Sequence, residues 1–349
     1  MDKKNMGKPY LKKAFSGLNL SGIFFTLFLY LLFIAKSLNA ASDGEALVYR
    51  LKWLKNVSTV GDLYAVEAGL FQAGGLSVTL KDGGPERDAI KELELGYAQF
   101  GVASADQVVR AVAKGAPVVV VAQIFQINPL QWIYHDDEAP IDEIKTLKGK
   151  TIGITFGGND ETIMQTLLAT AGLSEKDVRF FSVRYDYTPF YNRSVTLWPV
   201  YRNAQAVILS EKLKAAGKGV RFLDPDRFGI RFAANSVVTS AQLLKSRPDT
   251  VRRFVTALLA GWEKAINPVN QEKALQFIRP FDRDTPIDIL EKQLAVTRTM
   301  VHPDAHIPIG TIDVAAWRQT ARMMRDQGRI PREIDIGKIL QPVGVSTNP

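Results

Sequence analysis

The chain of 349 residues contains no cysteine and only three histidines. The absence of cysteine excludes disulfide bonds, thiolate metal ligands and a lipid-modified cysteine as a membrane tether. The histidines are His135, His302 and His306, and Pro303 between the last two predicts a loop there rather than a helix face. Two histidines in a loop are ordinary surface residues more often than metal ligands, so we predict no metal site and no cofactor.

Several motifs of common catalysts are absent as well. The sequence has no G-x-S-x-G, H-E-x-x-H or G-x-x-x-x-G-K-[ST] segment. We therefore predict a non-enzymatic protein without catalytic residues. One glycine-rich turn, TFGGND at residues 155–160, precedes a predicted helix. In one interpretation its N–H groups bind an anion, and in the other its glycines only allow a left-handed backbone.

Long apolar runs are scarce, and the clearest lies at the N-terminus. Residues 23–35 (IFFTLFLYLLFIA) follow a lysine-rich leader and precede small residues around Ala40. This order is typical of a secretory signal peptide. The apolar run is shorter than the ~20 residues that span a bilayer, so we favour cleavage near Ala40 over an uncleaved anchor, and assign residues 1–40 to a signal peptide.

The positive charge is concentrated in the same leader. The whole chain carries a formal net charge of +8, and removing residues 1–40, with six Lys and one Asp, lowers it to +3. The remaining Lys and Arg residues are spread among acidic ones. A nucleic-acid partner needs a clustered basic face, so we predict none.

The remainder alternates short apolar strands with helical segments, which is typical of an α/β fold with parallel sheets covered by helices. The first unit has predicted strands at 48–54, 76–81, 100–103 and 117–125, with helices at 62–68, 85–95 and 104–113. A second unit has predicted strands at 151–155, 178–183, 220–223 and 231–235. Helices follow at 248–267, 285–300 and 313–327. Two such units without a flexible linker predict two lobes packed together.

The candidate ligand-binding residues carry an aromatic ring or a polar group, and most lie near the end of a predicted element. They are Trp53, Asn56, Tyr64, Ser104, Phe125, Asn159, Asp160, Tyr185, Tyr187, Trp198, Tyr201 and Asn203. Core packing or helix capping is the alternative for each of them; Ser104 and Asn159 suit N-caps, and Tyr64 suits a core. Aromatic faces combined with amides and carboxylates favour a flat, neutral heteroaromatic ligand over a small anion.

Six segments in order carry a resemblance that spans residues of about 48 to 300. They are LKWLKN, AGLFQAGGLSVTL, FGVASADQVVRAVAKGAPVVVVAQIFQINPL, LKGKTIGITFGGND, DPDRFGIRF and RFVTALLAGWEKAINP. In this arrangement the chain resembles the periplasmic substrate-binding proteins of ABC importers, in the NMT1/THI5-like branch that binds thiamine-precursor pyrimidines.

The resemblance implies a two-lobed type II periplasmic-binding-protein clamshell, each lobe a mostly parallel sheet flanked by helices. Lobe 1 would comprise residues 45–140 and 236–340, and lobe 2 residues 141–235. The ligand would lie in the cleft and pass to an ABC permease in the inner membrane, and the protein would be a periplasmic monomer. Trp53 and Asn56 would lie on the first lobe near Ser104 and Phe125, with Asn159 and Tyr187 on the second.

One departure from the pattern of this family leaves the identity of the ligand open. Pyrimidine binders of this family usually carry Asn-Glu in the segment that reads VYRNAQAV here, and Ala204 stands where the carboxylate is expected. One alternative is a binder of alkanesulfonate, nitrate or taurine, with TFGGND as the anion site. Another is a pyrimidine-processing enzyme of the same fold, although the cysteine-rich motif of the eukaryotic pyrimidine synthases is missing. A third is a sensory or scaffold protein that binds no small molecule.

Overall fold

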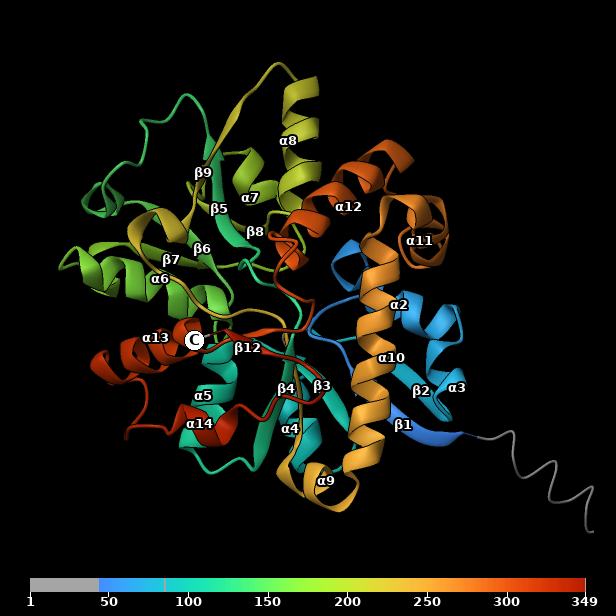
Figure 1. The fold of residues 1–349 in the computed structure, drawn as a ribbon. Coiled ribbons are helices and arrows are strands. Elements are labelled where there is room, and N and C mark those ends of the chain that lie inside the picture. Colours follow the sequence, from blue (N-terminus) through green and yellow to red (C-terminus); the bar gives the residue numbers. More distant parts are fainter. Residues whose placement is uncertain (1–43, 85, 349) are drawn as a thin grey trace, which may run out of the picture. The chain divides into compact units, whose positions relative to one another are not determined.

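The computed structural model describes residues 44–84 and 86–348, so the predicted signal peptide at residues 1–40 lies outside the described residues. Two groups of strands, each with its own helices, make up the described part (Figure 1). None of the helices in this part is both long enough and apolar enough to cross a membrane.

The first group is a five-stranded sheet of order β2-β1-β3-β10-β4. Its strands are β1 (Glu45–Arg50), β2 (Leu76–Lys81), β3 (Phe100–Ala103), β4 (Val118–Gln123) and β10 (Ser236–Ser240). Strand β1 is parallel to β2 and β3, whereas β10 is antiparallel to β3 and β4. The predicted strands at 76–81 and 100–103 are confirmed as β2 and β3.

The predicted strand at 231–235 is wrong, because the backbone of this segment bonds to other elements. The Ala233 carbonyl accepts the Ala105 N–H at 3.0 Å, and the Asn235 carbonyl accepts the Ile124 N–H at 2.9 Å. The strand begins only afterwards, at Ser236. It lies between β3 and β4 and is the one strand of the five that runs in the opposite direction, so the sheet is mostly parallel, as predicted.

Helices cover this sheet, and two of them cross very closely. They are α2 (Val60–Glu67) and α10 (Pro248–Ile266), which run along one side of the sheet (Figure 1). A Cβ on Gly261 would lie 2.6 Å from the Ala65 Cβ and 2.7 Å from the Gly61 carbonyl oxygen. A Cβ on Gly61 would overlap the indole of Trp262. The crossing therefore requires both glycines.

The remaining elements of this part are shorter or lie toward the C-terminus. They are α3 (Leu70–Ala73), α4 (Ala89–Glu94), α5 (Ala105–Ala113), α9 (Ala241–Ser246), α11 (Gln271–Ile278), α12 (Ile287–Val301), α13 (Val314–Asp326), α14 (Ile336–Ile339), β11 (Ile312–Asp313) and β12 (Thr347–Asn348). The helices predicted at 248–267, 285–300 and 313–327 correspond to α10, α12 and α13.

The second group of strands has mixed pairing. Strand β5 (Leu130–His135) lies between β8 (Trp198–Tyr201) and β9 (Val220–Leu223), antiparallel to both. Strands β6 (Thr151–Ile154) and β7 (Arg179–Ser182) form a parallel pair. The helices are α6 (Asn159–Thr170), α7 (Thr188–Tyr191) and α8 (Gln205–Ala215). Only β5 runs against the other four strands of this group, since β8 and β9 are both antiparallel to β5 and the bridge between Ile152 and Leu197, next to β8, is parallel. The prediction of mostly parallel strands holds here, although β5 and β8 were not predicted as strands.

Strand β5 also bears on the lobe boundaries. It pairs with strands of the second group although it precedes residue 140, where the sequence placed the end of the first segment of lobe 1. The division into residues 45–140 with 236–340 and residues 141–235 stays a prediction, with β5 as its exception.

Two crossover segments, residues 124–129 and 224–235, join the groups and are bonded to each other. The Asn128 amide donates to the Phe232 carbonyl at 2.9 Å. The Arg202 guanidinium donates to the Asn128 carbonyl at 3.2 Å and binds the Asp224 carboxylate through two nitrogens at 2.8 and 2.6 Å. This bidentate pair ties β8 to the second crossover.

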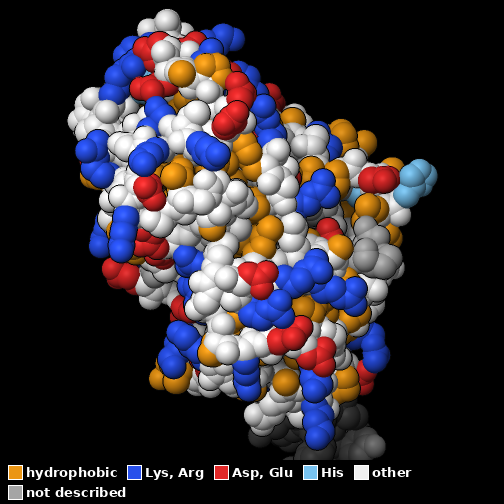
Figure 2. All heavy atoms as spheres, turned by 90° about the vertical axis from the view of Figure 1, so that its left-hand side faces the viewer, with side chains coloured by type: hydrophobic (Ala, Val, Ile, Leu, Met, Phe, Trp, Pro, Cys, Tyr) orange, Lys and Arg blue, Asp and Glu red, His pale blue; other side chains and the backbone are white. Residues whose placement is uncertain are grey.

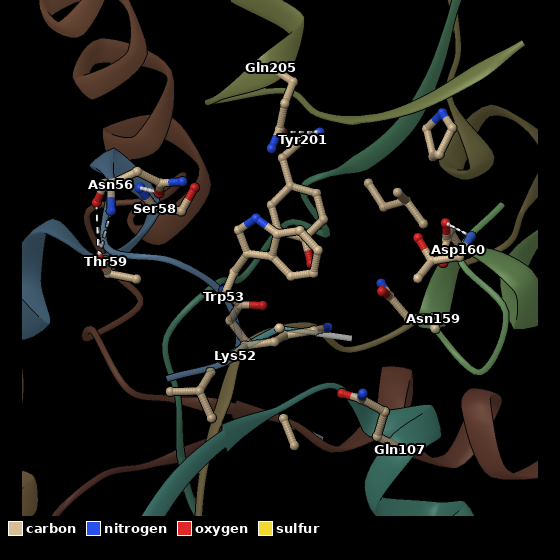
Figure 3. Close-up of a pocket in the computed structure, with 18 of the residues that line it drawn as sticks. Lys52, Trp53, Asn56, Ser58, Thr59, Gln107, Asn159, Asp160, Tyr201 and Gln205 are labelled. Carbon is tan, nitrogen blue, oxygen red and sulfur yellow. Dashed lines mark hydrogen bonds between the residues drawn. The ribbon is translucent and has the colours of Figure 1, made fainter. Parts of the chain in front are cut away.

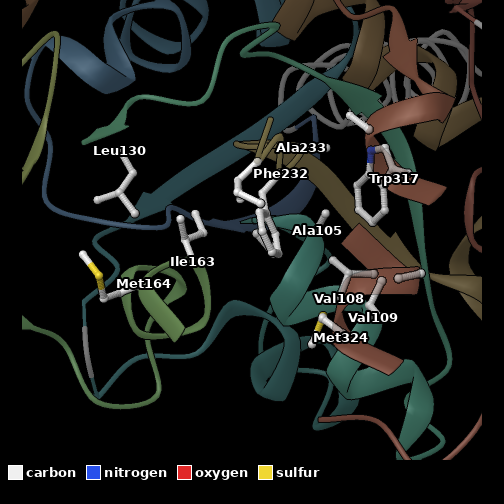
Figure 4. Close-up of a cluster of buried hydrophobic side chains, with 14 of the residues drawn as sticks. Ala105, Val108, Val109, Leu130, Ile163, Met164, Phe232, Ala233, Trp317 and Met324 are labelled. Carbon is white, nitrogen blue, oxygen red and sulfur yellow. The ribbon is translucent and has the colours of Figure 1, made fainter. Parts of the chain in front are cut away.

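A hydrophobic cluster continues from one group of strands into the other. Figure 4 shows side chains of α5, α6 and α13 with Phe232 of the second crossover between them. Trp317 and Met324 of α13 are completely buried. The outer surface is mixed in charge, and on the face in Figure 2 the Lys and Arg side chains are interspersed with Asp and Glu.

Candidate functional site

A cavity of about 260 Å³ is lined by residues from both groups of strands (Figure 3). The first group contributes the loop after β1, the start of α2, the end of β3 and one residue of α5. The second group contributes the turn after β6, the segment after β7 and strand β8. The volume lies just below the roughly 300–1,000 Å³ of pockets for drug-sized ligands.

The loop after β1 carries Trp53 and is firmly held. The predicted strand 48–54 ends earlier, at Arg50, so Trp53 lies in the following loop. Its carbonyl accepts the Gly83 N–H at 3.0 Å, and Lys55 forms an ion pair with Asp82 at 3.0 Å. The loop packs so closely on Gly83 that a Cβ there would overlap its backbone. Trp53 is thus presented to the cavity by a fixed loop.

Asn56 reaches the cavity while it caps the short 3₁₀ turn Val57–Thr59. Its side-chain oxygen accepts the Ser58 N–H at 2.8 Å, and the Thr59 hydroxyl oxygen accepts the Asn56 N–H at 3.2 Å. This capping box gives the amide oxygen of Asn56 one hydrogen-bond partner. Its NH₂ group takes no part in the capping box and can donate to a ligand.

A buried carboxyl lies at the first wall. Asp62 of α2 accepts the Tyr49 hydroxyl at 2.7 Å, and both residues line the cavity. Burial raises the pKa of Asp62 to about 7, while the Tyr49 hydrogen bond and the nearby Trp262 indole act in the lowering direction. Burial, followed by the charge of Asp62, raises the pKa of Tyr49. The pair makes this wall polar, with a charge that depends on pH near neutrality.

The TFGGND turn after β6 is closed by its own side chains. The Asp160 carboxylate accepts the Thr155 N–H at 2.6 Å, and Glu161 accepts the Gly157 N–H at 2.7 Å. The Gly158 N–H donates to the Thr155 carbonyl at 2.8 Å. These backbone donors are therefore already used, two by acidic side chains at the start of α6 and one within the turn. The geometry speaks against the anion-binding interpretation of this turn.

Asn159 and Asp160 are the first two residues of α6, and the N-cap residue is Gly158 without a side-chain cap. Their assignment as capping residues is therefore wrong. Burial raises the pKa of Asp160 to about 6, against the lowering effect of the Thr155 N–H. The side-chain nitrogen of Asn159 is buried without a hydrogen-bond partner within the described residues.

The second wall is aromatic. Tyr185 approaches Trp53 from the opposite side, with ring centroids 5.8 Å apart, and Tyr187 packs on Trp198 at 5.8 Å. Burial raises the pKa of Tyr187 to about 12, with a smaller contribution from Tyr191. Figure 3 shows Trp53 and Tyr201 projecting into the cavity from different walls. Rings on two sides can hold a flat ligand between them.

Eight of the twelve predicted site residues line this cavity: Trp53, Asn56, Asn159, Asp160, Tyr185, Tyr187, Trp198 and Tyr201. Ser104 is one of the four that do not. It caps α5, with its hydroxyl 2.6 Å from Asp106 and its N–H donating to Gln107 at 3.2 Å. Here the capping interpretation holds, and the cavity is lined by Gln107 instead.

The other three are structural. Tyr64 is buried against an aromatic ring of α11 at 5.2 Å, and Phe125 packs edge-on against Trp262 at 5.8 Å. The Asn203 amide donates to the Thr297 hydroxyl at 2.9 Å, which ties the start of α8 to α12. None of them lines the cavity.

Sequence reasoning missed several polar residues of the cavity wall: Lys52, Ser58, Thr59, Gln107, Gln205 and Asn235. Lys52 could have been selected as a site residue, because it directly precedes Trp53 in the same segment. Gln107 could have been selected too, because it is the third residue after Ser104 and completes a capping box. Asn235 had no such signal, because it is the last residue of the segment 231–235, which was predicted as a strand.

Unpaired polar atoms gather at the cavity. Within the described residues, eleven buried side-chain polar atoms lack a hydrogen-bond partner. Five of them belong to residues that line the cavity: Lys52 Nζ, Ser58 Oγ, Asn159 Nδ2, Asn235 Oδ1 and Trp262 Nε1. Unpaired buried polar groups are costly and uncommon in folded proteins, so their concentration at one cavity points to a partner that enters it.

The described part of the chain holds no group of three or more His, Cys, Asp or Glu side chains suited to a metal ion. His135 lies in the core of the second group, stacked on Phe190 at 4.7 Å and hydrogen-bonded to its carbonyl at 3.2 Å. It does not line the cavity.

Comparison with known proteins agrees with the resemblance drawn from the sequence. The sequence profile of the family described as NMT1/THI5 like matches residues 56–271, more than half of the chain. The riboflavin-binding protein RibY of Chloroflexus aurantiacus is 26% identical over 312 residues, 85% of each chain. The formylaminopyrimidine-binding protein of Halalkalibacterium halodurans is 23% identical over 84% of this chain and 90% of its own. The resemblance drawn from the sequence is confirmed.

Solved structures confirm the fold. The alkanesulfonate-binding protein SsuA of Xanthomonas axonopodis pv. citri, bound to MOPS, superposes with a TM-score of 0.67 at 15% identity, over 87% of this chain and 100% of that one. The predicted α/β fold of type II periplasmic binding proteins is therefore correct. The desulfurization enzyme DSZB shares it more distantly, with a TM-score of 0.55 at 13% identity over 85% of this chain and 96% of that one.

Proposed function

The chain belongs to the NMT1/THI5-like family, and from this premise we propose that it is the extracytoplasmic solute-binding component of an ABC importer. It captures a small heteroaromatic compound in the cavity between its two groups of strands and delivers it to a permease in the inner membrane. It acts in the periplasm as a monomer, after removal of residues 1–40.

One observation carries this proposal: aromatic side chains and unpaired buried polar atoms face the same cavity. Trp53, Tyr185 and Tyr201 supply flat apolar faces, and Asn159 and Asn235 supply unpaired amide atoms. A ring system with polar edge atoms satisfies both. The riboflavin and formylaminopyrimidine named for the two relatives are ligands of this class.

The test is thermal unfolding of the purified protein with pyrimidines, thiamine, flavins, purines, sulfonates and nitrate. A ligand at about a hundred times its dissociation constant stabilises the fold by ~2.7 kcal/mol, which raises the unfolding midpoint by several degrees. We expect pyrimidines or flavins to do so and Trp53→Ala to reduce the shift. A shift with sulfonates or nitrate alone would reject the heteroaromatic class.

Two further measurements separate binding from the alternatives. After prolonged incubation we expect the bound compound to be recovered unchanged by chromatography, and its conversion would place the chain among the enzymes of the fold. We also expect the exported protein to begin near residue 41, as determined by N-terminal sequencing. Retention of the leader would support the anchor.

A further inference from the structure

The segment LKWLKN contains two lysines in opposite situations. Lys55 forms an ion pair with Asp82 at 3.0 Å, its ammonium lies 5.1 Å from the ring centre of Phe281, and it does not line the cavity. Lys52 lines the cavity, and its ammonium nitrogen is buried with no hydrogen-bond partner among the described residues. A buried ammonium without a partner is costly, and an acceptor that enters the cavity removes this cost.

The carboxylates of the cavity wall already accept hydrogen bonds from other groups of the protein. Asp62 bonds to the Tyr49 hydroxyl, and Asp160 accepts the Thr155 N–H. Asp88 caps α4 by accepting the Ile90 N–H at 2.8 Å. Each carboxylate thus has a structural partner in the wall, and none of them bonds to Lys52.

The unpaired atoms of the cavity also favour one type of ligand group. Lys52 Nζ and Asn159 Nδ2 are donors, the Ser58 hydroxyl can donate or accept, and only Asn235 Oδ1 is an acceptor alone. The Asn56 amide adds another donor, its NH₂ group, which takes no part in the capping box. Figure 3 shows Lys52 and Asn159 pointing toward one another across the cavity. A donor-rich cavity with a cation suits an oxygen-rich, negatively charged group.

We infer that the ligand carries, in addition to its heteroaromatic ring, an anionic oxygen group, a carboxylate or a phosphate, and that Lys52 binds this group together with the side-chain amide of Asn159. This inference rests on the proposed function and narrows its substrate class. It places the anion beside Lys52 of the loop after β1, with the Asn159 side-chain amide as a second donor, and not on the backbone N–H groups of the TFGGND turn, which are already used. The ring then lies toward Trp53, the next residue in the loop.

The experiment compares ring compounds that differ only in the anion. Uracil is paired with uracil-6-carboxylate, and riboflavin with riboflavin 5′-phosphate, and each affinity is measured by titration calorimetry on the purified protein. A charge-assisted contact predicts that the anionic member of one pair binds about ten- to hundredfold more tightly than its neutral parent. The pair that shows this advantage tells a carboxylate from a phosphate.

Lys52→Met is expected to remove the advantage, and Lys55→Met, the matched control, to retain it. Lys52→Gln is a second neutral variant should the first fail to fold, and the unfolding midpoint of each variant checks its fold. Equal binding of neutral and anionic members, or an advantage that survives Lys52→Met, overturns the inference and leaves the proposed function standing. If none of the four compounds binds, the inference is overturned, and the proposed function is decided by the wider panel in thermal unfolding.

Discussion

Replacing Asp62 by asparagine isolates the cost of a buried carboxylate. The side chain is 3% exposed, and its pKa is raised from 3.8 to about 7, chiefly by burial. Between these values the folded chain holds a proton that the unfolded chain has released, so stability falls as the pH rises from about 4 to 7. A difference of about three pKa units corresponds to roughly 4 kcal/mol at pH 7 and above. The asparagine variant has no charge to bury and escapes this loss.

The assay is urea unfolding of the wild type and Asp62→Asn between pH 5 and 8. We expect the free energy of unfolding of the variant, relative to that of the wild type, to increase by about 1.4 kcal/mol per pH unit up to pH 7. Above pH 7 this difference should level off. Burial raises the pKa of Asp160 to about 6 in the same direction, but it is present in both proteins and cancels. If the free energies of unfolding of the two proteins change with pH in parallel, the cost assigned to the buried carboxylate is refuted.

A control tests the hydrogen bond itself. The Tyr49 hydroxyl favours the ionised form of Asp62, so Tyr49→Phe is expected to raise the pKa of Asp62 further. The upper end of the pH window then moves to higher pH. If the window moves down instead, the assignment of this bond is wrong.

Three other predictions concern packing, capping and the cavity. Gly61→Ala would drive a methyl group into the Trp262 indole, and we expect a loss of about 2–3 kcal/mol or more in urea unfolding. Ser104→Ala removes the N-cap of α5, and we expect a loss of about 1 kcal/mol of stability with an unchanged ligand affinity in calorimetry. Weaker binding would show that Ser104 contributes to the ligand site. Trp53→Ala should weaken binding about tenfold or more with an unchanged unfolding midpoint of the free protein, and an unchanged affinity would count against ring stacking.

Sequence reasoning worked best where a local pattern decided the structure. The alternation in LSVTLK gave β2, because a strand with one buried face repeats every two residues, and the apolar run FGVA gave β3, which is buried throughout. The reasoning failed for β5 and β10, which are buried along almost their whole length and show no alternation, and for the four-residue strand β8.

The same distinction applies to the cavity. Trp53 and Asn56 could be selected because they follow the carboxyl end of a strand, where open α/β sheets bind ligands. Tyr64 and Phe125 could not be separated from them, because an aromatic residue near an element end looks alike whether it faces a cavity or a core. The unpaired state of Lys52 and Asn159 is a property of the assembled fold and has no counterpart in a single sequence.

The paired crossovers restrict how the two groups of strands can move. The two connections lie side by side and are bonded at Asn128 and Phe232, an arrangement that favours rotation of the groups about the crossovers over sliding. Trp53 and Tyr185 approach each other from the two groups, so an opening rotation is expected to increase the distance between labels at these two positions.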